Sequence, residues 1–141
     1  MNILVTGGAG YIGSHTCIEL INSGFNPIII DNFQNSKEDI ISKIQELTRK
    51  NINYFNSDLK DKELIKKIIL DFNCESIIHF AGLKSVGESQ KNPLNYYSNN
   101  ISRTINLLEA MKETKIKKIV FSSSASVYGD PLFLPITENH P

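Results

Sequence analysis

The sequence predicts an α/β protein with a doubly wound parallel sheet between two layers of helices, a three-layer α/β/α architecture. Short β-branched runs alternate with amphipathic helical patterns along the 141 residues, and a glycine-rich turn joins the first run to the first helix. The connections are short, which favours parallel strands linked by right-handed helical crossovers. A chain of this length is expected to form one domain over residues 1–141.

Five strands and four helices are expected in alternation. Gly24 marks the end of the first helix, Ser36-Lys-Glu-Asp39 resembles a capping box at the start of the second, and Asp61 is a typical N-cap for the third. The expected strands cover residues 2–6, 27–31, 53–57, 76–81 and 118–122, and the expected helices cover 12–23, 36–47, 61–72 and 94–114.

Apolar stripes run along these helices and are expected to face the sheet; in the third helix the stripe is Leu64, Ile65, Ile68, Ile69 and Phe72. The stripe is Ile40/Ile41, Ile44 and Leu47 in the second helix, and Ile101, Ile105, Leu108 and Met111 in the last. Residues 129–141 contain turn-forming residues and no further element. A sheet that stops at its fifth strand leaves an uncovered edge, so we expect this chain to be part of a longer polypeptide.

The composition argues against several classes of partner. Acidic and basic residues number 15 each, so no net field attracts nucleic acid or an anionic membrane. The longest apolar runs fall far short of the roughly 20 residues that span a bilayer, and no secretory leader is visible. Cys17 and Cys74 have no metal-ligand spacing and read as small core residues. A cytoplasmic protein is therefore expected, with no metal site.

The stretch LVTGGAGYIGSH, from Leu4, predicts a dinucleotide-binding turn. It contains either Gly7-x-x-Gly10-x-x-Gly13 or Gly8-x-Gly10-x-x-Gly13, between a strand and a helix. Such a turn lets the backbone approach a pyrophosphate, and the helix start presents free N–H groups to it. An ordinary tight turn is the alternative for the glycines alone. The order strand, glycines, helix and acid favours a Rossmann-type dinucleotide site.

Asp31 supplies the acid, 18 positions after Gly13 and at the end of the second expected strand. A carboxylate there accepts hydrogen bonds from the adenosine ribose and repels a 2′-phosphate. No arginine lies nearby in the sequence to receive that phosphate, and Lys37 is better suited to a helix start. NAD is therefore the expected cofactor, in preference to NADP.

Three further stretches, HFAGLKSVGES at 79–89, YYSNN at 96–100 and FSSSASVYGD at 121–130, accompany TGGAGYIGSH and DNFQNS. Together they closely resemble the extended short-chain dehydrogenase/reductase family, and within it the enzymes that act at C4 of UDP-glucose and UDP-galactose. The resemblance runs from Met1 to Pro141. It implies interconversion of the two sugars on bound NAD, and it covers less than half of such an enzyme, without the C-terminal substrate-binding lobe.

The resemblance also implies roles for individual residues. Lys84 would donate to the nicotinamide-side ribose and contact the substrate. Ser124 would be catalytic and substrate-binding, orienting the sugar 4-hydroxyl, with Ser123 as the alternative in the serine run. His79 is expected to be a hydrogen-bonded strand-end residue, and His15 and His140 have no partner arrangement. The implied cofactor-binding residues are Gly7, Gly10, Tyr11, Ile12, Gly13, Asp31, Asn32, Asn35, Ser36, Asp58, Leu59, Phe80, Ala81, Gly82, Lys84 and Asn99.

The family's chemistry needs a residue pair that this chain does not contain. A tyrosine of lowered pKa takes the 4-hydroxyl proton while hydride leaves C4, and hydride later returns to the other face of the keto sugar. A lysine four residues after that tyrosine helps to lower its pKa. No Tyr-x-x-x-Lys occurs among residues 1–141, so these residues alone are expected to be inactive.

Two alternatives remain open at this stage. One is another nucleotide-sugar enzyme of the family, a uronate epimerase or a 4,6-dehydratase, although Ala125 and Ser126 stand where dehydratases have an acidic pair. The other is a non-catalytic NAD-binding module. The resemblance further implies a homodimer of the whole protein, with the helix over 94–114 in the interface.

Overall fold

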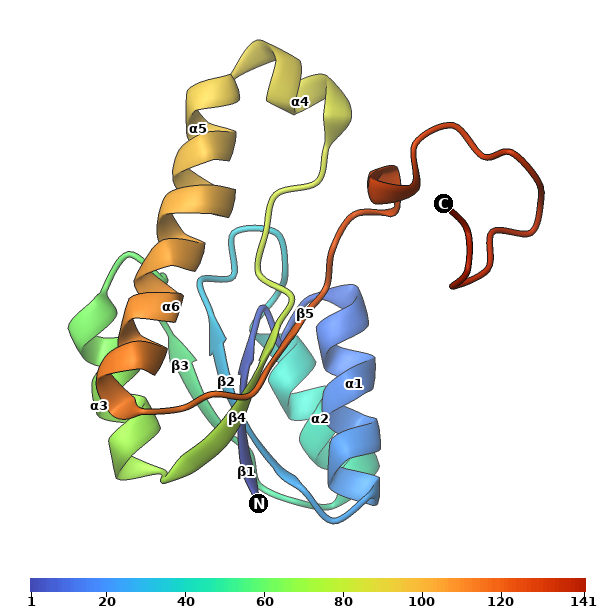
Figure 1. Cartoon of the computed structure of the whole chain (residues 1–141). Coiled ribbons are helices and arrows are strands. Elements are labelled where there is room, and N and C mark those ends of the chain that lie inside the picture. The colour runs from blue at the N-terminus through green and yellow to red at the C-terminus, as the bar shows by residue number, and fades with distance from the viewer.

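The computed structural model describes residues 1–141 and confirms the predicted parallel sheet between two helical layers (Figure 1). The strand order is β3-β2-β1-β4-β5, with every neighbouring pair parallel. The chain therefore winds outward from β1 in one direction and then crosses to the other side, which creates a switch point between β1 and β4. The strands are β1 (Asn2–Thr6), β2 (Asn26–Asp31), β3 (Asn53–Asn56), β4 (Cys74–His79) and β5 (Ile119–Phe121).

Helices cover both faces of this sheet. The first two pack on one face, and the third packs with the last on the other (Figure 1). None of them combines the length and the apolar character that a membrane span requires. The helices are α1 (Tyr11–Asn22), α2 (Asp39–Thr48), α3 (Lys62–Asp71), α4 (Val86–Lys91), α5 (Pro93–Tyr97) and α6 (Arg103–Thr114), with a π-helical turn at Ser98–Ser102 and a 3₁₀ turn at Ala125–Tyr128.

The core has two halves because successive strand residues point to opposite faces. In β1, Leu4 belongs to the cluster under α3 and α6, whereas Ile3 and Val5 belong to the cluster under α1 and α2. Cys17 and Cys74 are buried, one in each cluster, as the sequence predicts. Burial of each large aliphatic side chain contributes roughly 1.5–3 kcal/mol, so both layers are held to the central strands.

The predicted capping box at Ser36 is wrong. Helix α2 begins at Asp39, its N-cap is Glu38, and no side chain caps it. Ser36 lies three residues before the helix, in the loop after β2, and its hydroxyl donates to Asp31 Oδ1 at 3.0 Å. The N-cap at Asp61 is confirmed, since its Oδ1 accepts the Leu64 N–H at 2.9 Å.

The long final helix is present but is not regular. Helix α5, the π-helical turn and α6 follow one another from Pro93 to Thr114, and α4 occupies part of the preceding segment that was expected to be a loop. Asn100, within the π-helical turn, accepts the Leu83 N–H and donates to the Leu83 carbonyl, each at 2.8 Å. The irregular turn thus fastens the helix to the segment that follows β4.

The expected apolar stripes are partly wrong. Leu47 of α2 is exposed, and Ile101, Ile105 and Leu108 are about half exposed. Helix α6 instead buries Leu107, Ala110 and Met111. The inward face begins at Arg103, four residues before Leu107. Because Arg103 is charged, the spacing of apolar residues did not indicate this face.

Candidate functional site

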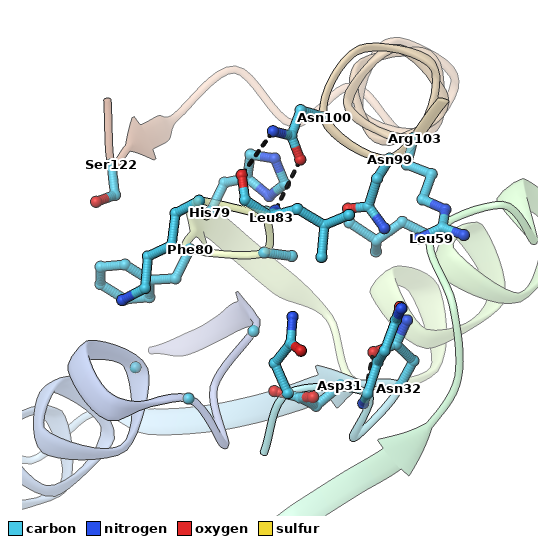
Figure 2. A pocket seen from close by; sticks show the side chains of 18 of the residues that line it. Asp31, Asn32, Leu59, His79, Phe80, Leu83, Asn99, Asn100, Arg103 and Ser122 are labelled. Carbon is cyan, nitrogen blue, oxygen red and sulfur yellow. Dashed lines mark hydrogen bonds between the residues drawn. The ribbon is translucent and has the colours of Figure 1, made fainter. Parts of the chain in front are cut away.

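A cleft of about 870 Å³ lies where the carboxyl ends of the strands meet at the switch point (Figure 2). The structure brings together in it every residue to which the sequence analysis gives a cofactor or sugar role. These are Gly7, Gly10, Tyr11, Ile12, Gly13, Asp31, Asn32, Asn35, Ser36, Asp58, Leu59, Phe80, Ala81, Gly82, Lys84, Asn99 and Ser124, and the alternative Ser123 lines the cleft as well. Their roles toward a ligand stay predictions.

The glycine turn forms the floor between β1 and α1. Gly7 has φ +71°, and a Cβ added to it would lie 2.7 Å from the Ala81 nitrogen. A Cβ on Gly13 would lie 2.2 Å from the Gly7 carbonyl oxygen. Both positions therefore require glycine, which favours the reading that starts at Gly7. Gly8 does not line the cleft, because it packs on Ile29.

The start of α1 faces this cleft with its backbone donors unoccupied. Its N-cap is Gly10, which has no side chain to accept the first amides, and no acidic residue stands in the first turn. The first N–H groups of a helix have no intrahelical acceptor, and they carry the positive end of the helix dipole. Tyr11 and Ile12 are exposed here. This arrangement suits an anion such as a pyrophosphate.

Asp31 lies beside the turn, and three protein donors fix its carboxylate. Oδ2 accepts the Ala9 N–H at 3.0 Å, and Oδ1 accepts the Phe33 N–H at 2.9 Å and the Ser36 hydroxyl at 3.0 Å. A carboxylate oxygen offers two lone pairs, so Oδ1 is saturated and Oδ2 keeps one. Asp31 can thus accept one ribose hydroxyl in a fixed direction.

Asp58 forms a second carboxylate centre near Asp31. Its Oδ2 accepts from the Asn32 side chain at 3.1 Å, and its Oδ1 lies 2.8 Å from Arg103 Nε (Figure 2 shows Asn32 and Arg103). Sequence reasoning missed Arg103 and expected no arginine near Asp31. The two ion-pair partners lie 45 positions apart, so no local pattern could have revealed the contact.

The opposite end of the cleft is more open. Lys84 is exposed and makes no hydrogen bond or ion pair within the protein. Ser124 precedes the 3₁₀ turn, and its Oγ accepts the Ser126 N–H at 3.2 Å and lies 2.8 Å from Ser126 Oγ. Ser122, from the end of β5, marks this side in Figure 2. The sequence analysis also missed Asn100, although two consecutive asparagines inside a predicted helix were a usable signal.

His79 lies beneath the cleft and is hydrogen-bonded on both ring nitrogens, as predicted. Nδ1 is 2.5 Å from Thr6 Oγ1, and Nε2 is 3.0 Å from Thr104 Oγ1. Burial lowers the pKa of His79 to about 4, because the charged imidazolium loses hydration there. His79 is therefore neutral at physiological pH and joins β1, β4 and α6.

The prediction that His140 has no partner arrangement is wrong. His140 is buried, and its Nε2 accepts the Leu132 N–H at 3.1 Å. Its ring packs against Phe133 and Tyr128. The cluster closes the C-terminal segment on itself and does not line the cleft.

Comparison with known proteins identifies a matching family and proteins of similar sequence. A family model described as GDP-mannose 4,6 dehydratase matches residues 4–141. The UDP-glucose 4-epimerase of Bacillus subtilis is 52% identical over 141 residues, which are 100% of this chain and 42% of that protein. The chain therefore spans about two fifths of the length of this relative.

Solved structures of UDP-glucose 4-epimerases also match this chain over nearly its whole length. UDP-glucose 4-epimerase from Bifidobacterium longum, in complex with NAD+ and UDP, has a TM-score of 0.94 at 46% identity, with coverage of 100% of this chain and 42% of that one. The Stenotrophomonas maltophila enzyme, with bound NAD and formylated UDP-arabinopyranose, has a TM-score of 0.94 at 43% identity and coverage of 99% and 41%. Their fold over the shared part is the fold of this chain.

Proposed function

The chain belongs to the family described as GDP-mannose 4,6 dehydratase, and on this premise we propose that it forms the NAD-binding part of an enzyme that interconverts UDP-glucose and UDP-galactose. Residues 1–141 make up the Rossmann-type domain of that enzyme, and a C-terminal lobe supplies most of the sugar-nucleotide contacts. Several relatives that are about half identical to this chain are named UDP-glucose 4-epimerase, which supports this activity within the family.

One observation carries the proposal. A single cleft contains a donor-rich helix start, a fixed carboxylate at Asp31, and the exposed hydroxyl of Ser124 at a different end. The first two features suit a dinucleotide, and the third suits a group that reacts next to it. The tight turn that brings the start of α1 to the cleft depends on Gly7 and Gly13, where an added Cβ would meet the backbone of Ala81 and of Gly7.

The chain's own residues then bind and orient. The first amides of α1 hold the pyrophosphate, and Asp31 accepts one ribose hydroxyl through Oδ2. Lys84, free of other partners, donates to the nicotinamide-side ribose. NAD held by these residues would supply the reversible hydride acceptor that the interconversion needs. Ser124 keeps its proton available to the sugar 4-hydroxyl when Ser126 acts as the donor of their shared hydrogen bond, and so fixes the direction of that hydroxyl.

The proton acceptor for the reaction lies outside residues 1–141 in this proposal, since no Tyr-x-x-x-Lys occurs within them. We expect that pair within about fifteen residues after Pro141, at the spacing the family resemblance implies. Reading the coding sequence beyond Pro141 tests this directly. A downstream sequence without the pair would remove the epimerase proposal and leave a binding module.

The activity itself is tested by adding UDP-galactose to the purified full-length protein and measuring UDP-glucose. We expect interconversion without net accumulation of NADH, whereas residues 1–141 alone should be inactive. Bound NAD with no interconversion would favour the non-catalytic module. Release of water and a 4-keto-6-deoxy product would favour a dehydratase, which Ala125 and Ser126 argue against because neither can act as an acid or a base.

The exposed stripe of Ile101, Ile105 and Leu108 supports a homodimer of the whole protein. Sedimentation analysis should give twice the monomer mass, and Ile105→Glu should reduce it to the monomer mass. A monomeric wild type would contradict this part of the proposal. We also propose a cytoplasmic location, which fits two cysteines that form no disulfide, and localisation of the tagged full-length protein tests it.

A further inference from the structure

We infer that Arg103 is a positioning residue at the adenine end of the cleft, where it holds the Asp58 carboxylate so that the site selects a 6-aminopurine. The inference rests on the proposed NAD site and adds a residue to it. Arg103 lines the cleft from the first turn of α6, and Asp58 lies in the loop between β3 and α3 (Figure 2 shows Arg103 beside Leu59).

The Asp58 carboxylate has one acceptor position left. Oδ1 accepts from Arg103 Nε at 2.8 Å and from the Lys60 N–H at 2.9 Å. Oδ2 accepts from the Asn32 side chain at 3.1 Å. Since each oxygen has two lone pairs, Oδ1 is saturated and Oδ2 can accept one further hydrogen bond. Arg103 and the Lys60 N–H thus decide which oxygen faces the ligand.

A donor stands beside this acceptor. The Leu59 N–H has no acceptor within the protein, and Leu59 also lines the cleft. An acceptor next to a donor complements adenine, whose 6-amino group donates and whose N1 accepts. Hypoxanthine has the reverse pattern, with a 6-oxo acceptor and an N1–H donor. A hypoxanthine ring would therefore place acceptor against acceptor and donor against donor, provided that Asp58 cannot turn.

The ion pair is well placed to prevent that turn. The side chains of Arg103 and Asp58 are only 21% and 17% exposed, so solvent screens their attraction less than it screens an open surface pair. Asn106 separately anchors the same loop, through the Leu59 carbonyl at 3.2 Å and the Lys60 carbonyl at 3.3 Å. Replacing Arg103 therefore removes the one charged partner that holds the Asp58 carboxylate, while Asn106 still holds the loop to α6.

A different role for Arg103 would be to receive the 2′-phosphate of NADP. The charges at this end disfavour it, because Asp31 and Asp58 outnumber the one guanidinium and leave a net negative site. The experiment separates the two roles by comparing three dinucleotides.

Binding of NAD, nicotinamide hypoxanthine dinucleotide and NADP is measured by calorimetry on purified protein freed of nucleotide. We expect the wild type to prefer NAD over the hypoxanthine analogue by at least about tenfold, a difference typical of one charged hydrogen bond. Arg103→Met should weaken NAD binding about tenfold and change the analogue less than about twofold, so the preference largely disappears. Arg103→Lys keeps the charge and should restore part of it.

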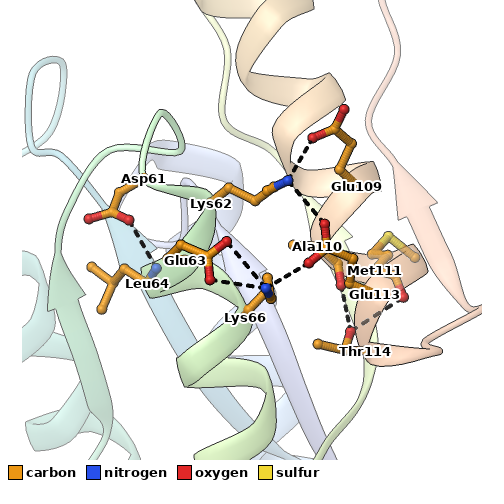
Figure 3. A network of polar contacts seen from close by, with 10 residues as sticks. All are labelled: Asp61, Lys62, Glu63, Leu64, Lys66, Glu109, Ala110, Met111, Glu113 and Thr114. Atoms are coloured by element: carbon orange, nitrogen blue, oxygen red, sulfur yellow. Dashed lines mark hydrogen bonds and ion pairs between the residues drawn. The ribbon is translucent and has the colours of Figure 1, made fainter.

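Lys62→Met is the matched control. Lys62 also joins α3 to α6, through Glu109 at 3.1 Å and Glu113 at 3.0 Å, but it does not line the cleft (Figure 3). It should leave the NAD preference unchanged. An equal loss of both dinucleotides in Arg103→Met, or a loss confined to NADP, would overturn the inference while the proposed function stands. A wild type that binds no NAD would overturn both.

Discussion

The two ends of the cleft differ in how completely this chain organises them. At the Asp31 end, three donors fix one carboxylate, and Asn32, Lys60 and Arg103 fix another. At the other end, Lys84 has no partner and Ser124 is held only by a neighbouring serine. Preorganised donors and acceptors bind without paying for reordering. The difference teaches that residues 1–141 hold the polar groups of the Asp31 end in fixed positions and leave those of the Ser124 end with few partners.

The largest expected effect comes from Gly13→Ala, which should reduce both the folding stability and the binding of NAD. Gly13→Ala places a methyl group 2.2 Å from the Gly7 carbonyl oxygen, so the start of α1 must move away from the sheet. We expect a loss of about 3 kcal/mol in the free energy of unfolding and no measurable NAD binding. Urea unfolding and calorimetry measure the two. Gly87→Ala is the control, because its added methyl group meets nothing within 4 Å; an effect of similar size there would contradict the steric explanation.

The next effect concerns the contact that joins α6 to the sheet below the open end. Burial holds the pKa of His79 at about 4 against an ordinary 6.5, so the unfolded chain binds more protons between these values. The free energy of unfolding should therefore fall as the pH drops through this window, by up to about 3 kcal/mol. Urea unfolding at pH 7 and pH 4.5 measures the loss.

His79→Gln removes this titration and should flatten that part of the pH dependence, at the cost of a lower stability at pH 7. The exposed His15→Gln should leave the wild-type slope unchanged. If the slope persists in His79→Gln, other groups account for the acid sensitivity.

A smaller effect is expected when one residue at each end of the cleft is replaced, which compares the two ends directly. Asp31→Asn removes the charge that three donors and a ribose hydroxyl share, so NAD affinity should fall roughly 10- to 100-fold. Ser124→Ala should change NAD affinity less than about threefold but slow turnover of the full-length enzyme about 100-fold. Calorimetry and a UDP-galactose assay give the two readings. Equal losses of NAD affinity would show that the ends do not differ.

Sequence reasoning succeeded where a contact is local. The cap at Asp61 depends on a residue a few positions away, and the central strands β1 and β2 follow from apolar runs that are buried on both faces of a parallel sheet. The glycine turn follows from its position between β1 and α1. The grouping of these residues around one cleft was therefore predicted in outline. The predicted cap at Ser36 was wrong even at short range, because α2 begins only at Asp39 and Ser36 stays in the loop, where its hydroxyl donates to Asp31.

Contacts between distant segments could not be predicted in this way. The pairing of Arg103 with Asp58 and the clamp of Asn100 on Leu83 join elements that only the three-dimensional fold brings together. The same limitation explains the misread face of α6. Apolar spacing pointed to Ile105 and Leu108, whereas packing against α3 buries Leu107 and Ala110.

The two buried cysteines give each layer its own built-in reporter. Cys17 lies on the buried face of α1, and Cys74 lies in β4 beneath α3 and α6. Burial raises the pKa of the two thiols to about 12 and about 11. Alkylating reagents attack the thiolate, so each sulfur reacts only when its own half of the core opens. Mass spectrometry of the labelled peptides would then time the opening of the two halves separately, in the unmodified molecule and without any introduced probe.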